Sequence, residues 1–359
     1  MSGGVDSSVA AAILHDQGHE VIGVTMRLLP GKATGFGCCG APEDLLIAKR
    51  SAEKIGIPHY VLDYSREFGE RVIDYFVNSY LVGETPNPCL ACNRHIKFDR
   101  LKAFGASLGT SHIATGHYAR IDNDGGAFRL YEAIDPTKDQ SYVLFNFNQT
   151  GLASTLFPVG DRPKTEIREM ARRFELPNAD KKDSQEICFV PNRDYGTFIE
   201  DRLKERGQIS AVTAPGPLVN EAGETVGQHK GAAYYTIGQR SGLNGGAAQK
   251  MYVTKIDAGS NTVVVGPDAK NLAAGLRAVD MNWLHGAPTA SFEALVKIRY
   301  KHEPTPATVV VSGEETVVRF REPQRAVSPG QAAVIYRWDD NRGCREVLGG
   351  GKIAAAVVE

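Results

Sequence analysis

The sequence predicts an α/β domain with a parallel sheet, followed by a small central β-rich domain and a C-terminal β-barrel. Helical and strand patterns alternate through the first half of the chain, and this alternation is typical of a parallel sheet covered by helices on both faces. After about residue 197 the pattern changes to short strands that turn at Gly, Asn and Asp, as in a β-barrel. We expect three domains, over residues 1–197, 198–262 and 263–359.

Each element expected in the first half has a recognisable boundary. Residues 5–17 place apolar side chains on one helical face and end at Gly18, a glycine C-cap. Residues 20–28 are rich in Val and Ile and predict a buried strand. A second helix, residues 42–55, begins with a proline, and a strand follows at residues 59–63. Further elements are helices at 67–81, 98–108 and 194–206, a strand at 112–115 and a hairpin turn at 123–126.

Composition and charge limit the possible partners. The chain has 359 residues, with 41 Lys and Arg against 42 Asp and Glu, so its formal net charge is −1. Such a chain has no overall field that would draw it to nucleic acid, and an RNA partner needs local basic stretches. Three stretches are basic, at residues 94–102, 162–173 and 297–302. Because no apolar run is long enough for a membrane span and no signal-peptide pattern is present, we expect a cytoplasmic protein with no membrane partner and with reduced thiols.

The segment Ser2-Gly3-Gly4-Val5-Asp6-Ser7-Ser8 opens the first expected helix and has the composition of a phosphate-binding loop. Its two glycines let backbone N–H groups approach an anion, its three hydroxyls add donors, and the helix contributes its positive N-terminal end. Asp6 is placed to bind a Mg²⁺ ion that bridges the phosphates. The alternative is an ordinary glycine-rich helix cap. A cap would explain a lone Ser-Gly-Gly better than it explains all seven residues.

Two other glycine runs imitate nucleotide-binding motifs. Residues 35–40 satisfy G-x-G-x-x-G, but Pro30 and Gly31 separate them from the preceding strand, whereas the dinucleotide motif begins where the strand ends. Residues 349–352 (GGGK) resemble a Walker A loop but are followed by Ile353 instead of a hydroxyl residue. We expect neither run to bind a nucleotide, and we expect the second to be a turn of the barrel.

The six cysteines differ in their spacing. Cys89 and Cys92 form a C-x-x-C pair, which can share a metal, a cluster or a disulfide. The chain has no second such pair to complete a closed zinc site. Taken without further context, Cys188 would be one more buried cysteine. Three others are expected to fill space as small apolar residues: Cys38, Cys39 and Cys344.

Together these motifs resemble those of one enzyme family. The heptapeptide SGGVDSS is similar to the PP-loop of the N-type ATP pyrophosphatases, which cleave ATP between its α and β phosphates to adenylate a substrate. Within that superfamily the chain resembles the tRNA-specific 2-thiouridylases over nearly its whole length. The resemblance implies an adenine nucleotide alpha hydrolase-like fold for the first domain. The matching stretches are SGGVDSSVAA, VTMR, ETPNPCLACNRHIKF, ATGHYAR, KDQSYVLF, DSQEICFV, YYTIGQR, KIRY and SPGQAAV.

The resemblance implies an ATP-dependent transfer of sulfur to tRNA. ATP would adenylate the carbonyl oxygen at carbon 2 of the wobble uridine with loss of pyrophosphate, and sulfur would then replace that oxygen. Cys188 corresponds to the cysteine that carries sulfur as a persulfide, and Cys92 corresponds to the catalytic nucleophile, near the positive charges of Arg94 and Lys97. Their reaction would leave a disulfide that must be reduced. A sulfur-donor protein, either a cysteine desulfurase or a relay protein, would load a monomeric enzyme.

The resemblance also implies which residues bind the substrates. ATP would be held by Ser2, Gly3, Gly4, Val5, Asp6, Ser7 and Ser8 at its phosphates, by Met26 at the adenine and by Gly116. The tRNA would be contacted by Asn87, Pro88, Cys89, His117, Lys138, Asp139, Gln140, Arg299, Tyr300 and Gln331.

The chain departs from the family pattern in two places, and two other functions stay open. An apolar strand usually precedes the PP-loop, so we expect a further segment of about ten residues before it, because an unfilled central strand position leaves backbone groups unpaired. Cys89 stands where many relatives carry Asp, so Cys89, Cys92 and Cys188 could instead hold three irons of a 4Fe-4S cluster. The remaining alternatives are a PP-loop synthetase that forms an acyl-adenylate and a non-catalytic RNA-binding protein with a degenerate nucleotide site.

Overall fold

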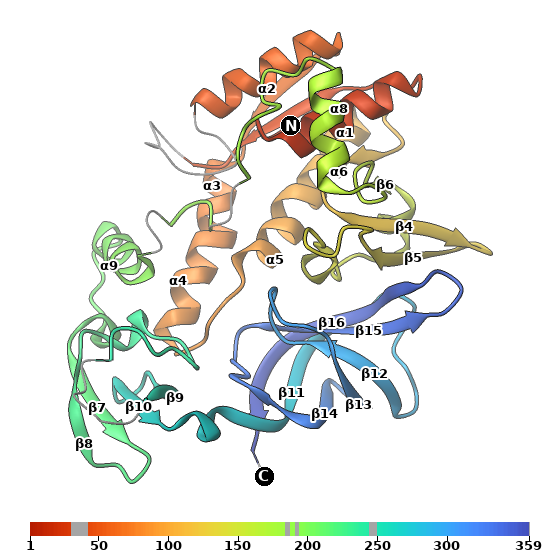
Figure 1. Cartoon of the computed structure of the whole chain (residues 1–359). Coiled ribbons are helices and arrows are strands. Elements are labelled where there is room, and N and C mark those ends of the chain that lie inside the picture. The colour runs from red at the N-terminus through yellow and green to blue at the C-terminus, as the bar shows by residue number, and fades with distance from the viewer. Residues whose placement is uncertain (30–41, 184–186, 191–193, 244–249, 359) are drawn as a thin grey trace. The chain divides into compact units, whose positions relative to one another are not determined.

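The chain divides into two compact units, each built from segments that are distant in the sequence (Figure 1). The structure is a computed structural model that describes residues 1–29, 42–183, 187–190, 194–243 and 250–358. The first unit comprises Met1–Ile73, Pro88–Pro191 and Arg337–Leu348, and the second comprises Asp74–Asn87, Asn192–Tyr336 and Gly349–Glu359. The three expected domain ranges stay predictions.

The first unit contains the predicted alternation of helices with parallel strands. Strand β1 (Gly23–Arg27) pairs in parallel with β2 (His59–Asp63), with Gly23 opposite His59. A second parallel pair joins β3 (Ile113–Ala114) to β6 (Thr155–Leu156). The α/β class of this unit is therefore confirmed. The helices predicted at residues 5–17 and 42–55 are α1 (Val5–Asp16) and α2 (Pro42–Ile55).

Two π-helical turns lie in or beside the expected helices. The helix predicted at residues 67–81 consists of α3 (Ser65–Phe68), a π-helix (Gly69–Ile73) and α4 (Asp74–Leu81). A period of 3.6 residues cannot reveal such turns, because each inserts an extra residue without breaking the helical path. The helix predicted at residues 98–108 is confirmed as α6 (Asp99–Ser107), but it is preceded by α5 (Pro88–Cys92) and a π-helix (Asn93–Phe98) that were not predicted.

Helices α1 and α8 (Lys164–Arg173) pack side by side in the core of the first unit (Figure 1). The sequence pattern did not predict α8, because most of its residues are charged and its apolar face is only three residues long. That face consists of Ile167, Met170 and Ala171, which pack with Val9 of α1. The segment after α8 continues the same core. The cluster comprises Val5, Val9, Ala10, Ile13, Tyr118, Ala133, Val159, Ile167, Met170, Ala171, Leu176 and Ala179.

A hairpin in the first unit follows the predicted turn. Strands β4 (Ala119–Asp124) and β5 (Ala127–Glu132) are antiparallel, and Gly125 and Gly126 between them have φ of +61° and +96°. Two successive positive φ angles suit a two-residue hairpin loop and favour glycine. Strand β5 also pairs with the first part of β16, where Tyr131 lies opposite Glu346.

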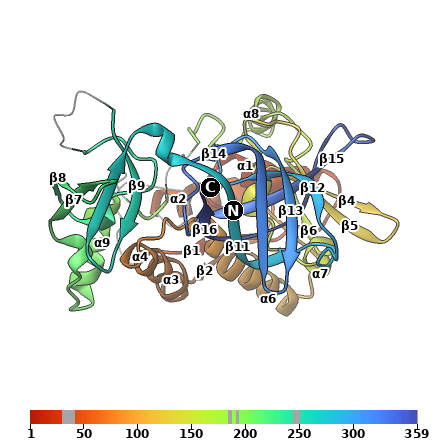
Figure 2. The ribbon, with the colours of Figure 1, turned by 90° about the horizontal axis from the view of Figure 1, so that it is seen from below.

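The second unit carries helix α9 (Tyr195–Glu205), as predicted, and two β structures (Figure 2). A four-stranded sheet has the order β8-β7-β10-β9, and six strands from β11 to β16 close into a barrel through pairing of β11 with β16. The predicted β-rich module and β-barrel are therefore confirmed. The strands are β7 (Gly216–Asn220), β8 (Thr225–His229), β9 (Tyr252–Asp257), β10 (Thr262–Gly266), β11 (Leu272–Trp283), β12 (Phe292–Lys297), β13 (Thr305–Ser312), β14 (Glu315–Arg325), β15 (Ala332–Asp339) and β16 (Cys344–Val357).

The GGGK run is part of a strand, so the expected turn at residues 349–352 is wrong. These residues lie inside β16 and pair with β11, where Gly350 is opposite Asn282. A Cβ atom at Gly349 would lie 2.4 Å from the Asn282 carbonyl oxygen, so the glycines permit a close approach of two strands. The other glycine run, residues 35–40, lies outside the described residues. No helix in the described part of the chain is long and apolar enough to cross a membrane.

Candidate active site

The phosphate-loop candidate forms a tight turn at the start of α1. Gly3 has φ of +72°, and a Cβ atom there would lie 2.6 Å from the Asp44 carbonyl oxygen, so the turn requires glycine. Gly4 is the N-cap of α1, and no described side chain caps the first turn of the helix. The hydroxyls of Ser7 and Ser8 donate back to the Gly4 carbonyl. The first N–H groups of α1 are therefore left for an anion.

Gly116 lies against this loop. A Cβ atom on Gly116 would come within 2.6 Å of the Asp6 carbonyl carbon and the Ser7 nitrogen. Only a residue without a side chain allows this approach. The structure thus brings together two of the predicted ATP-binding elements, the PP-loop and Gly116. The third, Met26, is half-buried near the end of β1.

The Asp6 carboxylate is held at the loop by two donors from distant parts of the sequence. The Tyr118 hydroxyl donates to Asp6 Oδ1 over 2.8 Å, and Lys164 Nζ donates to the same oxygen over 2.6 Å. Burial, and then the charge of Asp6, raises the pKa of Tyr118 well above its usual value, so Tyr118 stays a donor. Both bonds reach Oδ1, and the Asp6 side chain is 29% exposed. A carboxylate with one oxygen engaged and partial exposure fits a magnesium ligand.

Lys164 connects Asp6 to a second carboxylate, Asp183. Lys164 is 7% exposed, and its Nζ lies 2.9 Å from Asp183 Oδ1. Lys138 and Arg168 also pair with Asp183, at 2.8 and 2.9 Å. Burial raises the pKa of Asp183, but hydrogen bonds from Lys138 and Lys164 outweigh it and hold the pKa below its usual value. We call Lys138, Lys164, Arg168 and Asp183 the Asp183 cluster.

Five residues that surround the loop and contact it or its partners were missed by the sequence interpretation. Two of them have a signal, because Tyr118 and Asp183 lie in the matching stretches ATGHYAR and DSQEICFV. Lys164 was counted only as part of the basic stretch at residues 162–173, and nothing in the sequence connects it to Asp6. The complete set is Tyr118, Lys164, Asn178, Lys181 and Asp183.

The basic stretch at residues 162–173 is largely neutralised inside the first unit, so it offers little free charge to an RNA. Arg162 pairs with Glu166, and Arg172 lies 3.0 Å from Asp180. Lys164 and Arg168 both pair with Asp183, as described above.

The predicted cysteines differ in exposure. Cys89 and Cys92 lie at opposite ends of α5, and Cys89 is exposed while Cys92 is 7% exposed. Cys188 has intermediate exposure. In the described part of the chain, no group of three or more His, Cys, Asp or Glu side chains is arranged to hold a metal ion. The residues present therefore do not form a ready site for an iron–sulfur cluster in this conformation.

Several residues expected to contact tRNA also have internal partners. The Asp139 carboxylate, in a residue 6% exposed, accepts bonds from the backbone of Ala133 and from Ser141. Gln140 accepts a bond from the Tyr118 backbone. His117 is 8% exposed, and its Nδ1 lies 2.7 Å from the Thr115 hydroxyl. These three contacts with tRNA stay predictions, as does the contact of Lys138, which pairs with Asp183.

The second unit holds four of the expected tRNA residues, Asn87, Arg299, Tyr300 and Gln331. Tyr300 is 41% exposed and Arg299 donates to the Arg325 carbonyl, both just after β12. Gln331 donates to the Thr85 carbonyl over 2.8 Å. Asn87 is half-buried in the second unit, and Pro88, at the start of α5 in the first unit, is buried.

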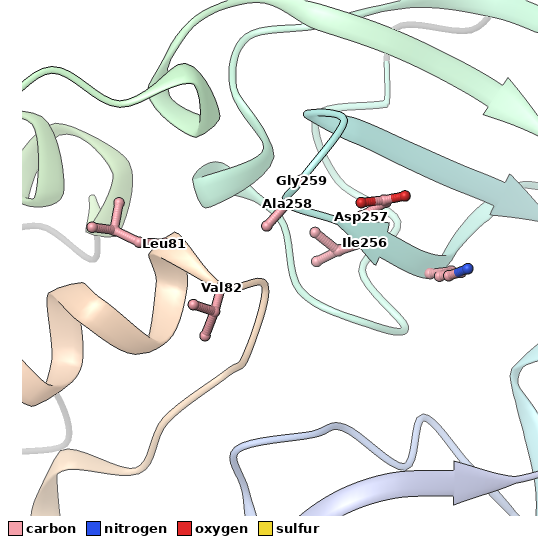
Figure 3. A pocket seen from close by; sticks show the side chains of 7 residues that line it. Leu81, Val82, Ile256, Asp257, Ala258 and Gly259 are labelled. Atoms are coloured by element: carbon pink, nitrogen blue, oxygen red, sulfur yellow. The ribbon is translucent and has the colours of Figure 1, made fainter.

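The second unit also contains an open cavity of about 530 Å³ (Figure 3). Leu81 and Val82, at and just after the end of α4, line one side, and residues 255–259 of β9 and its following turn line the other. None of the expected site residues lies in this cavity.

Three family profiles together match almost the whole chain. The profile described as "tRNA methyl transferase HUP domain" matches residues 1–192. The "tRNA methyl transferase PRC-barrel domain" matches residues 198–267, and the "Aminomethyltransferase beta-barrel domain" matches residues 273–353. The first profile alone covers more than half of the chain.

Curated relatives match the chain from end to end. It is 47% identical to the tRNA-specific 2-thiouridylase MnmA of Geobacter metallireducens, over 100% of this chain and 96% of that protein. It is 45% identical to the protein of the same name from Chloroflexus aurantiacus, over 100% of this chain and 98% of that protein. A solved NMN synthetase from Francisella tularensis is 17% identical over 58% of this chain and 76% of its own, with a TM-score of 0.33, which is too distant to support an argument. The similarity to the curated relatives shows that the chain belongs to the tRNA-specific 2-thiouridylase family.

Proposed function

We propose that this protein uses ATP to replace the oxygen at carbon 2 of the wobble uridine in tRNA with sulfur. The observation that carries the proposal is the 47% identity to a tRNA-specific 2-thiouridylase over the whole chain, together with a phosphate loop whose helix end is uncapped among the described residues. The descriptions of two matching profiles mention a methyltransferase. The PP-loop favours adenylation instead, because methyl transfer requires no cleavage of ATP.

The first step is activation of the base by ATP. The N–H groups at the start of α1 would bind the phosphates, and Lys164 adds a buried positive charge 2.6 Å from Asp6. Asp6 would hold the magnesium ion that accompanies ATP, which neutralises phosphate charge. The uridine oxygen attacks the α phosphate and pyrophosphate leaves. This step converts a poor leaving group on carbon 2 into AMP, a good one.

The second step transfers sulfur. The terminal sulfur of a Cys188 persulfide attacks carbon 2 and AMP departs with the former oxygen. The Cys92 thiolate then attacks the Cys188 sulfur, which releases 2-thiouridine and forms a disulfide between the two cysteines. A thiol reductant must restore the enzyme, and a sulfur-donor protein must reload Cys188. The intermediate exposure of Cys188 suits a group that must meet a donor.

The tRNA would be bound by local basic residues, since the net charge is only −1. Two of the three basic stretches remain candidates, because residues 162–173 are largely paired with carboxylates inside the first unit. Residues 94–102 begin two positions after Cys92, and residues 297–302 include Arg299 and exposed Tyr300.

A tRNA-dependent pyrophosphate assay separates this function from its alternatives. We expect purified protein to release pyrophosphate from ATP only when unmodified tRNA is present. Release without tRNA would favour a small-molecule synthetase, and no release would favour a non-catalytic RNA-binding protein. Iron analysis and absorbance after anaerobic purification test the cluster alternative, because active, iron-free protein would exclude it.

A further inference from the structure

Asn178 reaches the phosphate loop from a segment that follows α8. Asn178 is 2% exposed, and its side-chain Nδ2 lies 3.2 Å from the Gly3 carbonyl oxygen, 2.9 Å from the Gly4 carbonyl oxygen and 3.0 Å from Ser8 Oγ. The Ser8 hydroxyl donates in turn to the Gly4 carbonyl over 3.2 Å. A single buried amide therefore holds two consecutive peptide units of the loop.

Fixing these two carbonyls also fixes two N–H groups. In a trans peptide the C=O and N–H bonds point in opposite directions. The Gly3 carbonyl shares its peptide with the Gly4 N–H, and the Gly4 carbonyl shares its peptide with the Val5 N–H. When Asn178 draws both carbonyls to one side, the two N–H groups must face the other side, at the uncapped start of α1.

The segment that carries Asn178 is anchored to the core of the first unit and to α8. Its neighbours Leu176 and Ala179 are buried in the same core cluster as α1. Arg168 donates to the carbonyls of Ala179 and Lys181, at 3.2 and 3.0 Å. Lys181 adds a bond of 3.3 Å to the Gly3 carbonyl. The segment thus joins the phosphate loop to α8 through several independent contacts.

The other atom of the amide argues against a purely structural role. Among the described residues, Asn178 Oδ1 is buried and has no hydrogen-bond partner. A buried acceptor without a donor destabilises a fold. An Asn at this position is therefore better explained by the task of its Nδ2 group than by stability.

We propose that Asn178 is a positioning residue for ATP, which orients the Gly4 and Val5 N–H groups toward the phosphates. This proposal rests on the proposed function, because it assumes that the loop binds ATP. It predicts that loss of the Nδ2 donor weakens nucleotide binding while tRNA binding persists.

The test measures binding of α,β-methylene-ATP, which cannot be cleaved at the relevant bond, by isothermal titration calorimetry. We expect Asn178→Asp and Asn178→Ala to bind it at least tenfold more weakly at pH 8, with tRNA affinity within twofold of the wild type. Lowering the pH should protonate the buried aspartic acid and restore a donor, so Asn178→Asp regains affinity while Asn178→Ala does not. The matched control is Asp180→Asn, two residues away with an 82% exposed side chain.

Two results would overturn the proposal in different ways. If both Asn178 variants bind the analogue within twofold of the wild type, Asn178 does not position the loop and the proposed function survives. If the wild type itself does not bind the analogue, the proposed function fails and this proposal fails with it. Thermal unfolding and tRNA binding show whether a variant has lost its fold. If Asn178→Asp has lost its fold, the affinity of Asn178→Ala for the analogue decides the test, because this variant introduces no charge.

Discussion

Replacing Asp183 by Asn should destabilise the first unit, because the Asp183 carboxylate pairs with all three cations of the Asp183 cluster. Three cations lie within 2.9 Å of it, and its side chain is 23% exposed. A hydrogen bond to a charged group contributes about 1.5–3 kcal/mol when it is well buried. Asn keeps one acceptor oxygen but brings an NH₂ group against cations. We expect the free energy of unfolding to fall by about 2 kcal/mol, or the unfolding midpoint by ~4–8 °C.

The matched control for this change is Asp180→Asn on the same segment. Asp180 pairs with Arg172 at 3.0 Å, but the two side chains are 82% and 59% exposed. Such a surface pair contributes about 0–1 kcal/mol. Thermal unfolding followed by circular dichroism compares the two variants with the wild type at pH 7. A loss for Asp183→Asn no larger than the loss for Asp180→Asn would refute the role assigned to the Asp183 cluster.

The effect of Asp183→Asn should also depend on pH. The pKa of Asp183 is held below its usual value in the folded protein, so its contribution is complete above the unfolded pKa of about 4. The contribution is lost as the pH falls through the lower folded pKa. The difference in stability between wild type and variant should therefore be constant from pH 7 to 5 and shrink toward pH 3. A difference that stays constant down to pH 3 would contradict this assignment.

Three further predictions concern activity and binding. Lys164→Met should lower tRNA-dependent pyrophosphate release by about 100-fold, since it removes a preorganised charge at the phosphates. Release at the wild-type rate would mean that Lys164 takes no part in ATP cleavage. Gly116→Ala places a methyl group 2.6 Å from the Asp6 backbone and should weaken ATP binding in calorimetry, whereas Gly259→Ala, with 3.4 Å to its nearest neighbour, should not. Arg299→Ala should weaken tRNA binding and reduce the slope of log affinity against log salt by about 1, and an unchanged slope would mean that Arg299 contacts no phosphate.

Much of the fold follows from patterns that repeat over several residues. Gly18, the proline that opens α2 and the Gly125-Gly126 turn each mark a boundary that the structure reproduces within two residues. The π-helical turn after Cys92 did not follow, since one inserted residue leaves the apolar pattern nearly unchanged. The GGGK run was misjudged for a related reason, because glycines that permit close strands look like those that permit turns.

The candidate site was predictable only where its residues are adjacent in sequence. The PP-loop is one heptapeptide, so its composition indicates phosphate binding directly. The groups that surround it come from residues more than 100 positions away, as Tyr118 and Lys164 do with Asp6. Pairing over such distances depends on how α8 packs on α1, which local patterns do not determine. The family resemblance covers only two of these surrounding residues, Tyr118 and Asp183, because only they lie inside its matching stretches.

Sulfur transfer to tRNA by this protein is tested most directly by a nucleoside analysis of the product. Unmodified tRNA is incubated with ATP and with protein whose Cys188 carries a ³⁴S-labelled persulfide, then digested and analysed by mass spectrometry. We expect ATP-dependent ³⁴S-labelled 2-thiouridine from the wild type. Cys92→Ser and Cys188→Ser should form none, although both should still release pyrophosphate with tRNA. Unmodified or methylated uridine from the wild type, or full labelling by the Cys92→Ser variant, would contradict it.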